Sequence, residues 1–389
     1  MSSSLIQHQA GVAIFLLVPL LIALFNMRSF RRMDAYGPPP TSPRVSILVP
    51  ARNEEATIGP CLRSLLAQRY PDFQVVVLDD DSSDGTWHAL QSMKAGDERL
   101  TILKGEPLPQ GWTGKNWACH QLSQVADGAL LLFTDADTRH EADALRCAVA
   151  ALLTEEADLV SAFPREVVVS WAERLIIPVI PWSMLSFMPL GLAYRVKTPL
   201  LSATNGQFML FTRRSYELTG GHMAVRHHVV DDIALGRKVK AAGLRWRLLD
   251  GTRLLQCRMY ESFSQVYHGM GKNLFAAFGY NVPVFLFIWL WLGLVFLEPP
   301  IVLIAGMAGV SLSAPSVGLA LAAVALSLAS WGLSHWRSRF PLYLALLYPL
   351  TIVLTVTVAI SSMVATLSGS TRWKGRTLPR PGEGRRGQL

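Results

Sequence analysis

The sequence contains few cysteines and no closely spaced cysteine pair. The four cysteines of the 389-residue chain are Cys61, Cys119, Cys147 and Cys257. Since no two of them form a C-x-x-C motif, neither a structural zinc site nor a disulfide framework is indicated. Reduced thiols in a cytosolic compartment are the simpler interpretation.

Charged residues are also scarce, at 16% of the chain, while 51% of the residues are hydrophobic and the mean hydropathy is +0.30. This composition excludes an ordinary soluble protein. The charged residues fall mainly between Arg28 and Lys272 and again after Arg372, and the lipid-like runs lie outside that middle block. The pattern predicts one soluble domain, large enough for a single core, flanked by membrane segments.

The N-terminal apolar run lacks the marks of a secretory signal peptide. It extends from Gly11 to Phe25, after a polar and uncharged start, and no small-residue cleavage site follows. Instead Arg28, Arg31 and Arg32 follow it. By the positive-inside rule, we expect a membrane anchor with its N-terminus outside and the next domain in the cytosol, at the plasma (inner) membrane.

The C-terminal part contains four apolar runs, Val284–Leu297, Ile301–Leu312, Val317–Leu333 and Leu342–Leu367. The first two are short for spanning and are separated by Glu298-Pro299-Pro300, so they form either one kinked helix or a tight hairpin. Four spans would return the basic tail to the cytosol but leave Arg337 and Arg339 outside, and three would do the reverse. The larger charge of the tail favours four.

The tail itself is basic within a chain of net charge +8. Its positive residues are Arg372, Lys374, Arg376, Arg380, Arg385 and Arg386. Nucleic-acid binding is one interpretation, but beside a membrane span the adhesion to anionic lipid is favoured. The predicted organisation is an anchor (1–33), a cytosolic domain (34–280), C-terminal membrane helices (281–370) and a basic tail (371–389).

The middle block shows an α/β pattern. Short apolar strands are expected at Val45–Val49, Val75–Leu78 and Leu130–Phe133, and Ile58, Leu62, Leu65 and Leu66 have helical spacing. Near-continuous apolar strands alternating with helices predict a mostly parallel, Rossmann-like sheet covered on both faces. Ligands bind such sheets beyond the carboxyl ends of the strands. The proline-broken segment Trp171–Ala193 fits short interfacial helices, with a buried core segment as the alternative.

Two acidic clusters follow these strands. Asp135-Ala136-Asp137 offers two carboxylates that can approach one side of a turn, which suits Mg²⁺ or Mn²⁺ bound to a diphosphate. The alternative is that Asp137 caps the helix that carries Ala144. Asp79, Asp80 and Asp81 follow the second strand in a loop able to bind a base and ribose. Three adjacent, mutually repelling aspartates disfavour a purely structural turn.

Three further segments carry polar residues suited to the same site. Pro50, Arg52 and Glu54 lie at a strand end and helix start, and Lys115 follows a glycine, which suits a diphosphate contact although no P-loop spacing is present. Asp231-Asp232 opens a helix that continues to Gly243. A carboxylate there can act as a general base, and the alternative is an acidic residue favoured by the helix dipole.

Together these motifs resemble family 2 glycosyltransferases of the GT-A fold, from Val45 to about Gly279. The family's V-D-D-G-S-T-D-G-T motif resembles Leu78–Thr86, with Asp81 where glycine is usual. The resemblance implies that Asp232 is the base, Asp80 a uracil or ribose contact and Glu54 a nucleoside contact. It also implies that Asp137 is the main ligand of the divalent metal, with Asp135 beside it.

The acceptor side is matched more loosely. Gly206-Gln207 begins a segment similar to the family's acceptor-side region, and we group both residues with the nucleotide-sugar contacts. The Q-x-x-R-W motif of processive synthases is not found. Instead Gly269-Met270-Gly271-Lys272-Asn273 resembles a segment of membrane glycosyltransferases that act on lipids such as carotenoid acids and hopanoids. Lys272 then either shares the diphosphate or faces lipid headgroups.

The resulting prediction is an inverting transferase that moves a sugar, from a UDP-sugar by preference, to a hydroxyl or carboxyl group of a membrane lipid such as a carotenoid or hopanoid. The acceptor would reach the site from the cytosolic leaflet. A processive polysaccharide synthase and an inactive GT-A-like binding protein are the alternatives. The expected partners are the donor, the lipid and the membrane, and no nucleic acid.

Overall fold

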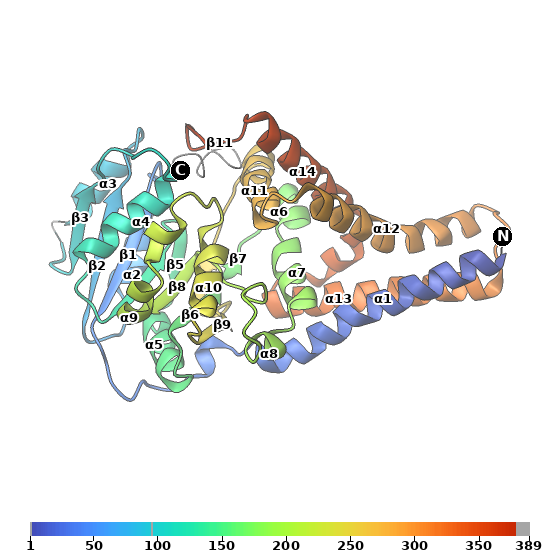
Figure 1. The fold of residues 1–389 in the computed structure, drawn as a ribbon, viewed down its shortest axis with the longest axis horizontal. Coiled ribbons are helices and arrows are strands. Elements are labelled where there is room, and N and C mark those ends of the chain that lie inside the picture. Colours follow the sequence, from blue (N-terminus) through green and yellow to red (C-terminus); the bar gives the residue numbers. More distant parts are fainter. Residues whose placement is uncertain (1, 95, 379–389) are drawn as a thin grey trace. The chain divides into compact units, whose positions relative to one another are not determined.

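The computed structural model describes residues 2–94 and 96–378 of the chain (Figure 1). These residues divide into two compact units, which we call the sheet unit and the helical unit. The sheet unit comprises Phe30–Val167, Leu192–Met259 and the described part of Gly369–Leu389. The helical unit comprises the described part of Met1–Ser29, together with Val168–Gly191 and Tyr260–Ser368.

The sheet unit contains all the strands that the described residues form. Its strands are β1 (Val45–Ala51), β2 (Phe73–Asp79), β3 (Leu100–Lys104), β4 (Leu130–Thr134), β5 (Thr138–His140), β6 (Leu159–Phe163), β7 (Arg165–Glu166), β8 (Phe208–Thr212), β9 (Trp246–Asp250), β10 (Leu255–Cys257), β11 (Arg372–Trp373) and β12 (Arg376–Thr377). Its helices are η1 (Met33–Ala35), α2 (Ile58–Leu66), α3 (Thr86–Lys94), α4 (Gly114–Val125), α5 (Ala144–Thr154), α9 (Arg213–Leu218), η2 (Gly221–Val225) and α10 (Asp231–Ala241).

The main sheet has seven strands in the order β3-β2-β1-β4-β8-β6-β9. Parallel pairing joins β3, β2, β1 and β4, and also β6 and β9, while β8 runs antiparallel to both of its neighbours. The three strands predicted from apolar runs are confirmed as β1, β2 and β4, and the predicted helix is confirmed as α2. Burial of the strands on both faces explains why their sequences are almost continuously apolar.

A small second sheet, in the order β5-β10-β7, follows the carboxyl end of β4. Strand β10 pairs antiparallel with β5 and parallel with β7. This sheet fixes the chain just after Asp137 on one side and places Glu166 on another of its strands.

The loops after β1 and β2 are joined by hydrogen bonds. The Ser83 amide donates to Asn53 Oδ1 (2.8 Å), and the Glu54 amide donates to Thr86 Oγ1 (2.7 Å). Asp84 Oδ1 accepts from the Thr86 amide (3.0 Å) at the start of α3. The loop that follows β1 and the loop that follows β2 are therefore joined to each other.

The helical unit contains the long apolar helices. Its elements are α1 (Ser2–Ser29), α6 (Trp171–Ile176), α7 (Val179–Phe187), α11 (Phe263–Ala277), α12 (Val282–Met307), α13 (Ala314–Ser338), η3 (Leu342–Leu347) and α14 (Tyr348–Ser368), and α8 (Leu190–Ala193) lies at the boundary of the two units. Among the described residues, four helices are long and apolar enough to cross a membrane: α1, α12, α13 and the stretch of η3 and α14.

Helix α12 corrects the expectation of four C-terminal spans. It runs without interruption through Pro299 and Pro300, so the two short apolar runs on either side form one helix. The preceding residue, Glu298, accepts hydrogen bonds from His8 (2.5 Å) and Gln9 (2.7 Å) of α1. These contacts hold the proline-containing part of α12 against its neighbour, and the C-terminal part therefore has three candidate spans.

The proline-broken segment forms the short helices that the sequence predicted. Helix α7 packs on α1 and α13, and Trp182 stacks on Trp331 with ring centroids 4.2 Å apart. The Trp182 indole donates to Ser330 Oγ (3.0 Å). Pro178 follows the end of α6 and Pro189 follows the end of α7, so the segment packs as separate short helices beside the long ones.

Helix α11 belongs to the helical unit. It packs on α14, and Phe275 shares a buried cluster with Phe285, Trp289 and Ala359. The predicted boundary of the cytosolic domain at residue 280 stays a prediction.

Candidate functional site

The acidic segments predicted from the sequence meet at one edge of the main sheet. Glu54 follows β1, Asp79 ends β2, and Asp135 follows β4. These strands are neighbours and parallel, so their carboxyl ends lie together. The N-terminus of α10 brings Asp231 and Asp232 to the same place, as the contacts below show.

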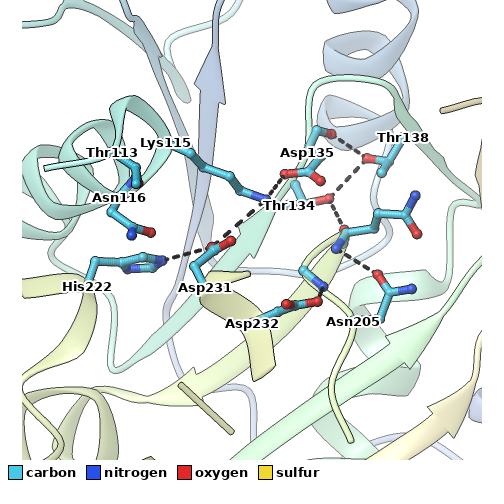
Figure 2. A network of polar contacts seen from close by, with 12 residues as sticks. Thr113, Lys115, Asn116, Thr134, Asp135, Thr138, Asn205, His222, Asp231 and Asp232 are labelled. Carbon is cyan, nitrogen blue, oxygen red and sulfur yellow. Dashed lines mark hydrogen bonds and ion pairs between the residues drawn. The ribbon is translucent and has the colours of Figure 1, made fainter. Parts of the chain in front are cut away.

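Lys115 connects the two halves of this site (Figure 2). Its ammonium lies 2.7 Å from Asp135 Oδ1 and 4.0 Å from Asp231 Oδ2. It lies in the first turn of α4, which Thr113 caps through its side chain. Burial alone would lower the pKa of Lys115, but Asp135 and Asp231 outweigh it and hold the pKa well above its usual value. Lys115 is therefore a permanent cation between the two acidic segments.

Asp232 is a partly buried carboxylate, and both of its oxygens accept hydrogen bonds from the backbone. Oδ2 accepts from the Gly206 amide (2.9 Å), and Oδ1 accepts from the Ile233 amide (2.8 Å). Burial and the neighbouring charge of Asp231 raise the pKa of Asp232 to about 6, against a smaller opposing effect of Lys115. A carboxylate with a pKa close to the working pH is suited to general base chemistry.

His222 lies behind Asp231, with Nε2 3.8 Å from Asp231 Oδ2 (Figure 2). Its other ring nitrogen is hydrogen-bonded to the Tyr216 hydroxyl (2.8 Å). Burial, with a smaller effect of Lys115, lowers the pKa of His222 to about 3, so the imidazole is neutral. Asp231 therefore pairs with Lys115 as its cation, while His222 supplies a fixed polar wall.

Asp135 and Asp137 fit the binding of a divalent cation. Burial, and then the charges of Asp135 and Glu54, raise the pKa of Asp137 to about 7. Within residues 2–94 and 96–378, Asp137 Oδ1 is buried without a hydrogen-bond partner. A buried carboxylate oxygen without a partner, beside other carboxylates, is the environment that a bound cation stabilises.

The alternative role of Asp137 as a helix cap is wrong. Asp137 precedes β5, and α5 begins at Ala144 with Asp143 at its N-cap position. In the described part of the chain, no group of three or more His, Cys, Asp or Glu side chains is arranged around one metal position. A hard divalent ion here would take two carboxylates and complete its shell with donor phosphate oxygens and water.

The loop that follows β2 contains both buried and exposed aspartates. Asp79 and Asp80 are buried, whereas the Asp81 side chain is 86% exposed. Asp81 adopts a left-handed backbone conformation (φ 56°), which explains why glycine is usual at this place in the motif. Arg52 donates to the carbonyl oxygens of Asp80 and Asp81, the latter at 2.7 Å. Arg52 therefore stabilises the conformation of this turn.

The other predicted contacts are distributed between the units. Pro50 pairs with Leu78 inside the sheet, and Gln207 leads into β8, where its carbonyl accepts from Thr134 Oγ1 (2.7 Å). Lys272 lies on α11 of the helical unit, so its predicted contact with the diphosphate stays a prediction.

Three residues near the site were not predicted from the sequence. Glu166 of β7 is buried, and this burial, together with the charge of Asp137, raises its pKa well above the usual value. A two-residue strand gives no sequence signal that would have identified it. Lys374 and Arg376 pair with Glu54 and Asp80. Their signal was the Lys374-Gly375 turn, which we had treated as part of a basic tail.

Comparison with known proteins agrees with this geometry. The family described as Glycosyl transferase family 2 matches residues 46–218. This range contains β2, β4, all of β1 except its first residue, and the loops that follow β2 and β4. Residues 46–218 are a family 2 glycosyltransferase domain. The chain is thus a glycosyltransferase, and its sheet unit has the GT-A fold.

Two curated relatives and one solved structure are informative. The chain is 26% identical over 279 residues to 4,4'-diaponeurosporenoate glycosyltransferase of Staphylococcus haemolyticus, covering 69% of this chain and 71% of the relative. It is 28% identical over 258 residues to the Staphylococcus aureus protein of the same name, covering 64% and 65%. The structure of mannosyltransferase PcManGT from Pyrobaculum calidifontis, in complex with GDP-Man and Mn²⁺, is similar in fold, with a TM-score of 0.52 and 19% identity over 92% of this chain and 99% of that one.

Proposed function

We propose that this glycosyltransferase moves a sugar from a UDP-sugar to a terpenoid membrane lipid in a single inverting displacement. The observation that carries the proposal is the arrangement around Lys115, which lies between Asp135 on the donor side and Asp231-Asp232 on the acceptor side. The two relatives support the acceptor class, since their shared name describes a carotenoid carboxylate.

On the donor side, Asp135 and Asp137 would hold a divalent cation, Mg²⁺ or Mn²⁺, that neutralises charge on the leaving diphosphate. Lys115 supplies a fixed positive charge beside it. Asp79 offers a buried oxygen, Oδ1, that has no hydrogen-bond partner within the described residues. This oxygen suits an N–H or O–H donor of the nucleoside.

On the acceptor side, Asp232 accepts the proton of the attacking group. Its pKa of about 6 allows it to be ionised at neutral pH and still bind a proton during the displacement. A hydroxyl acceptor requires such a base. A carboxylic acid, with a pKa of about 4 in water, would arrive ionised and need none, so the effect of removing Asp232 distinguishes the two acceptor groups.

We also propose that the sheet unit and the C-terminal hairpin lie in the cytosol. The hairpin pairs with Asp80 and Glu54, so an even number of membrane crossings must separate it from the sheet unit. Two crossings, by the adjacent helices α12 and α13, satisfy this condition, and α14 then does not cross. The arrangement also places Arg337 and Arg339 in the cytosol with Arg28, as the positive-inside rule favours.

Cysteine labelling tests this topology. The four native cysteines are buried, so background labelling is low. In intact cells a membrane-impermeant maleimide is expected to label Ser311→Cys, between α12 and α13, and to label Arg372→Cys only after permeabilisation. Labelling of Arg372→Cys in intact cells would contradict the proposed sidedness of the hairpin.

The function itself is tested with purified full-length protein and Mn²⁺. UDP-glucose and GDP-mannose are supplied as donors in parallel, with carotenoid acids or hydroxylated terpenoids in detergent as acceptors, and products are identified by mass spectrometry. The proposal expects one sugar added per lipid and release of UDP. A ladder of products would support a processive synthase instead, and an absence of nucleotide release with either donor would contradict transferase activity on these substrates.

A further inference from the structure

A short hairpin follows the last helix of the chain and folds onto the sheet unit. Strands β11 and β12 pair with Arg372 opposite Thr377 and Trp373 opposite Arg376. The two turn residues, Lys374 (φ 44°) and Gly375 (φ 81°), both have positive φ. A type I′ turn, which joins two strands through a two-residue loop, requires this conformation. The turn therefore presents Lys374 at its tip and directs Arg376 from the following strand.

Arg376 forms a two-point ion pair with Asp80. Its Nη1 lies 2.5 Å from Oδ2, and its Nη2 lies 3.1 Å from Oδ1. Asp80 is only 5% exposed. Gly114 at the start of α4 makes this approach possible, because a Cβ there would collide with the Arg376 guanidinium and lie 2.9 Å from Asp80 Oδ2. The guanidinium therefore lies against the residue preceding Lys115.

Lys374 is held in a similar way by the loop that follows β1. Its ammonium pairs with Glu54 and donates to the Arg52 carbonyl (2.8 Å). In return, Arg52 Nε donates to the Lys374 carbonyl (3.2 Å). Backbone and side chain thus bind the turn to the same loop that carries the predicted nucleoside contact.

The site that these contacts border is rich in carboxylates. Carboxylates from the strand ends and α10 gather around it, and Lys115 and Arg52 are cations that pair with them. A nucleoside diphosphate is itself an anion, and a single divalent ion leaves the site negative. Lys374 and Arg376 add an ammonium and a guanidinium to this site, and both kinds of side chain bind phosphate groups in proteins.

We propose that Arg376 and Lys374 are donor-binding residues, which reach the diphosphate and ribose of the nucleotide sugar from the C-terminal hairpin. This inference rests on the proposed function, because it assumes a nucleotide-sugar donor at the strand ends. It assigns a binding role to two residues for which the sequence alone had favoured a contact with anionic lipid.

Both residues keep donor groups for this role. A guanidinium has five N–H groups, of which the Asp80 pair uses two, and an ammonium has three, of which Glu54 and the Arg52 carbonyl use two. An ionised carboxylate also has acceptor positions beyond the two that Arg376 occupies. Asp80 can therefore hold Arg376 and still accept a hydrogen bond from the nucleoside.

Titration calorimetry of the full-length protein with UDP in the presence of Mn²⁺ tests the inference, with GDP as a second probe. Arg376→Ala is expected to weaken UDP binding about tenfold or more, as for loss of a hydrogen bond to a charged group. Lys374→Ala is also expected to weaken UDP binding. The UDP affinity of Arg376→Lys is expected to lie between that of the unaltered chain and that of Arg376→Ala. The KM for the donor should rise in parallel, with a smaller change in kcat.

Arg372→Ala is the matched control, since it removes the same charge from an exposed position of the same hairpin. It is expected to bind UDP as the unaltered chain does. Equal UDP affinity of Arg376→Ala and the unaltered chain would overturn the inference while leaving the transferase proposal standing. Tighter binding would overturn it too and show that the hairpin shields the site.

Two further results complete the test. If the unaltered chain binds neither UDP nor GDP with Mn²⁺, the donor assumption fails, and the inference fails with it. If Arg376→Ala does not fold, Arg376→Lys carries the test, because it keeps the charge but loses the two-point geometry. Unchanged UDP affinity and donor KM in Arg376→Lys and Lys374→Ala together would then overturn the inference.

Discussion

Replacing Asp232 by asparagine is expected to reduce sugar transfer about 100- to 10,000-fold, the range typical of a lost general base. The amide has nearly the shape of the carboxylate but cannot take up the acceptor's proton. It also has one oxygen where the carboxylate has two. Either the Gly206 amide or the Ile233 amide therefore loses its acceptor, which costs about 1–3 kcal/mol of local stability.

The pH dependence gives an independent measure of the same group. A base with a pKa of about 6 is ionised above that pH, so kcat/KM should rise with pH and level off near neutrality. At pH 5 about one-tenth of the plateau rate should remain, with a slope of about one in the logarithmic plot below pH 6. The assay is the release of UDP with lipid acceptor present, measured from pH 4.5 to 8.

Three controls make this prediction decisive. Thermal melting shows whether Asp232→Asn is folded, and UDP binding with Mn²⁺ should stay close to that of the unaltered chain. Glu217→Gln removes an exposed carboxylate from α9 and should leave the rate unchanged. A rate for Asp232→Asn near that of the unaltered chain would refute the base assignment. If, in addition, kcat/KM fell only below about pH 4, the acceptor group would be a carboxylate.

Three other changes test the rest of the site. Lys115→Met should lower kcat/KM about 100-fold, because the charge that faces Asp135 and Asp231 is removed, and an unchanged steady-state rate would contradict its role. Asp137→Asn should raise the Mn²⁺ concentration needed for half-maximal activity at least tenfold, and equal metal titration curves would exclude it as a ligand. Asp81→Gly should raise the melting temperature slightly, since glycine adopts φ 56° without strain, while a fall in UDP affinity would show that the exposed carboxylate itself contacts the donor.

The sequence predicted the strands that carry the site because their burial on both faces leaves a nearly unbroken apolar run. Val45–Val49, Val75–Leu78 and Leu130–Phe133 became the core of β1, β2 and β4. The antiparallel strand β8 was not predicted as part of the sheet. Its direction and its position between β4 and β6 depend on a long connection, which local periodicity does not report.

The sequence predicted the membrane helices but gave one C-terminal span too many. Apolar length alone identified the runs on both sides of Glu298-Pro299-Pro300, and proline at their junction suggested a break. The structure continues α12 through this point, where His8 and Gln9 of α1 bind Glu298. A contact between residues almost 300 positions apart decided the matter, and no local pattern contains it.

The fold class, the family resemblance and the identity of the acidic residues were predictable from the sequence, because strand burial and motif spacing are local properties of the chain. Which charges form pairs became clear only from the folded structure. It placed Lys115 between Asp135 and Asp231, left Asp81 exposed, and brought Arg376 back from the end of the chain to Asp80. Charge pairing depends on distances in space, and between residues so far apart the chain order does not give these distances.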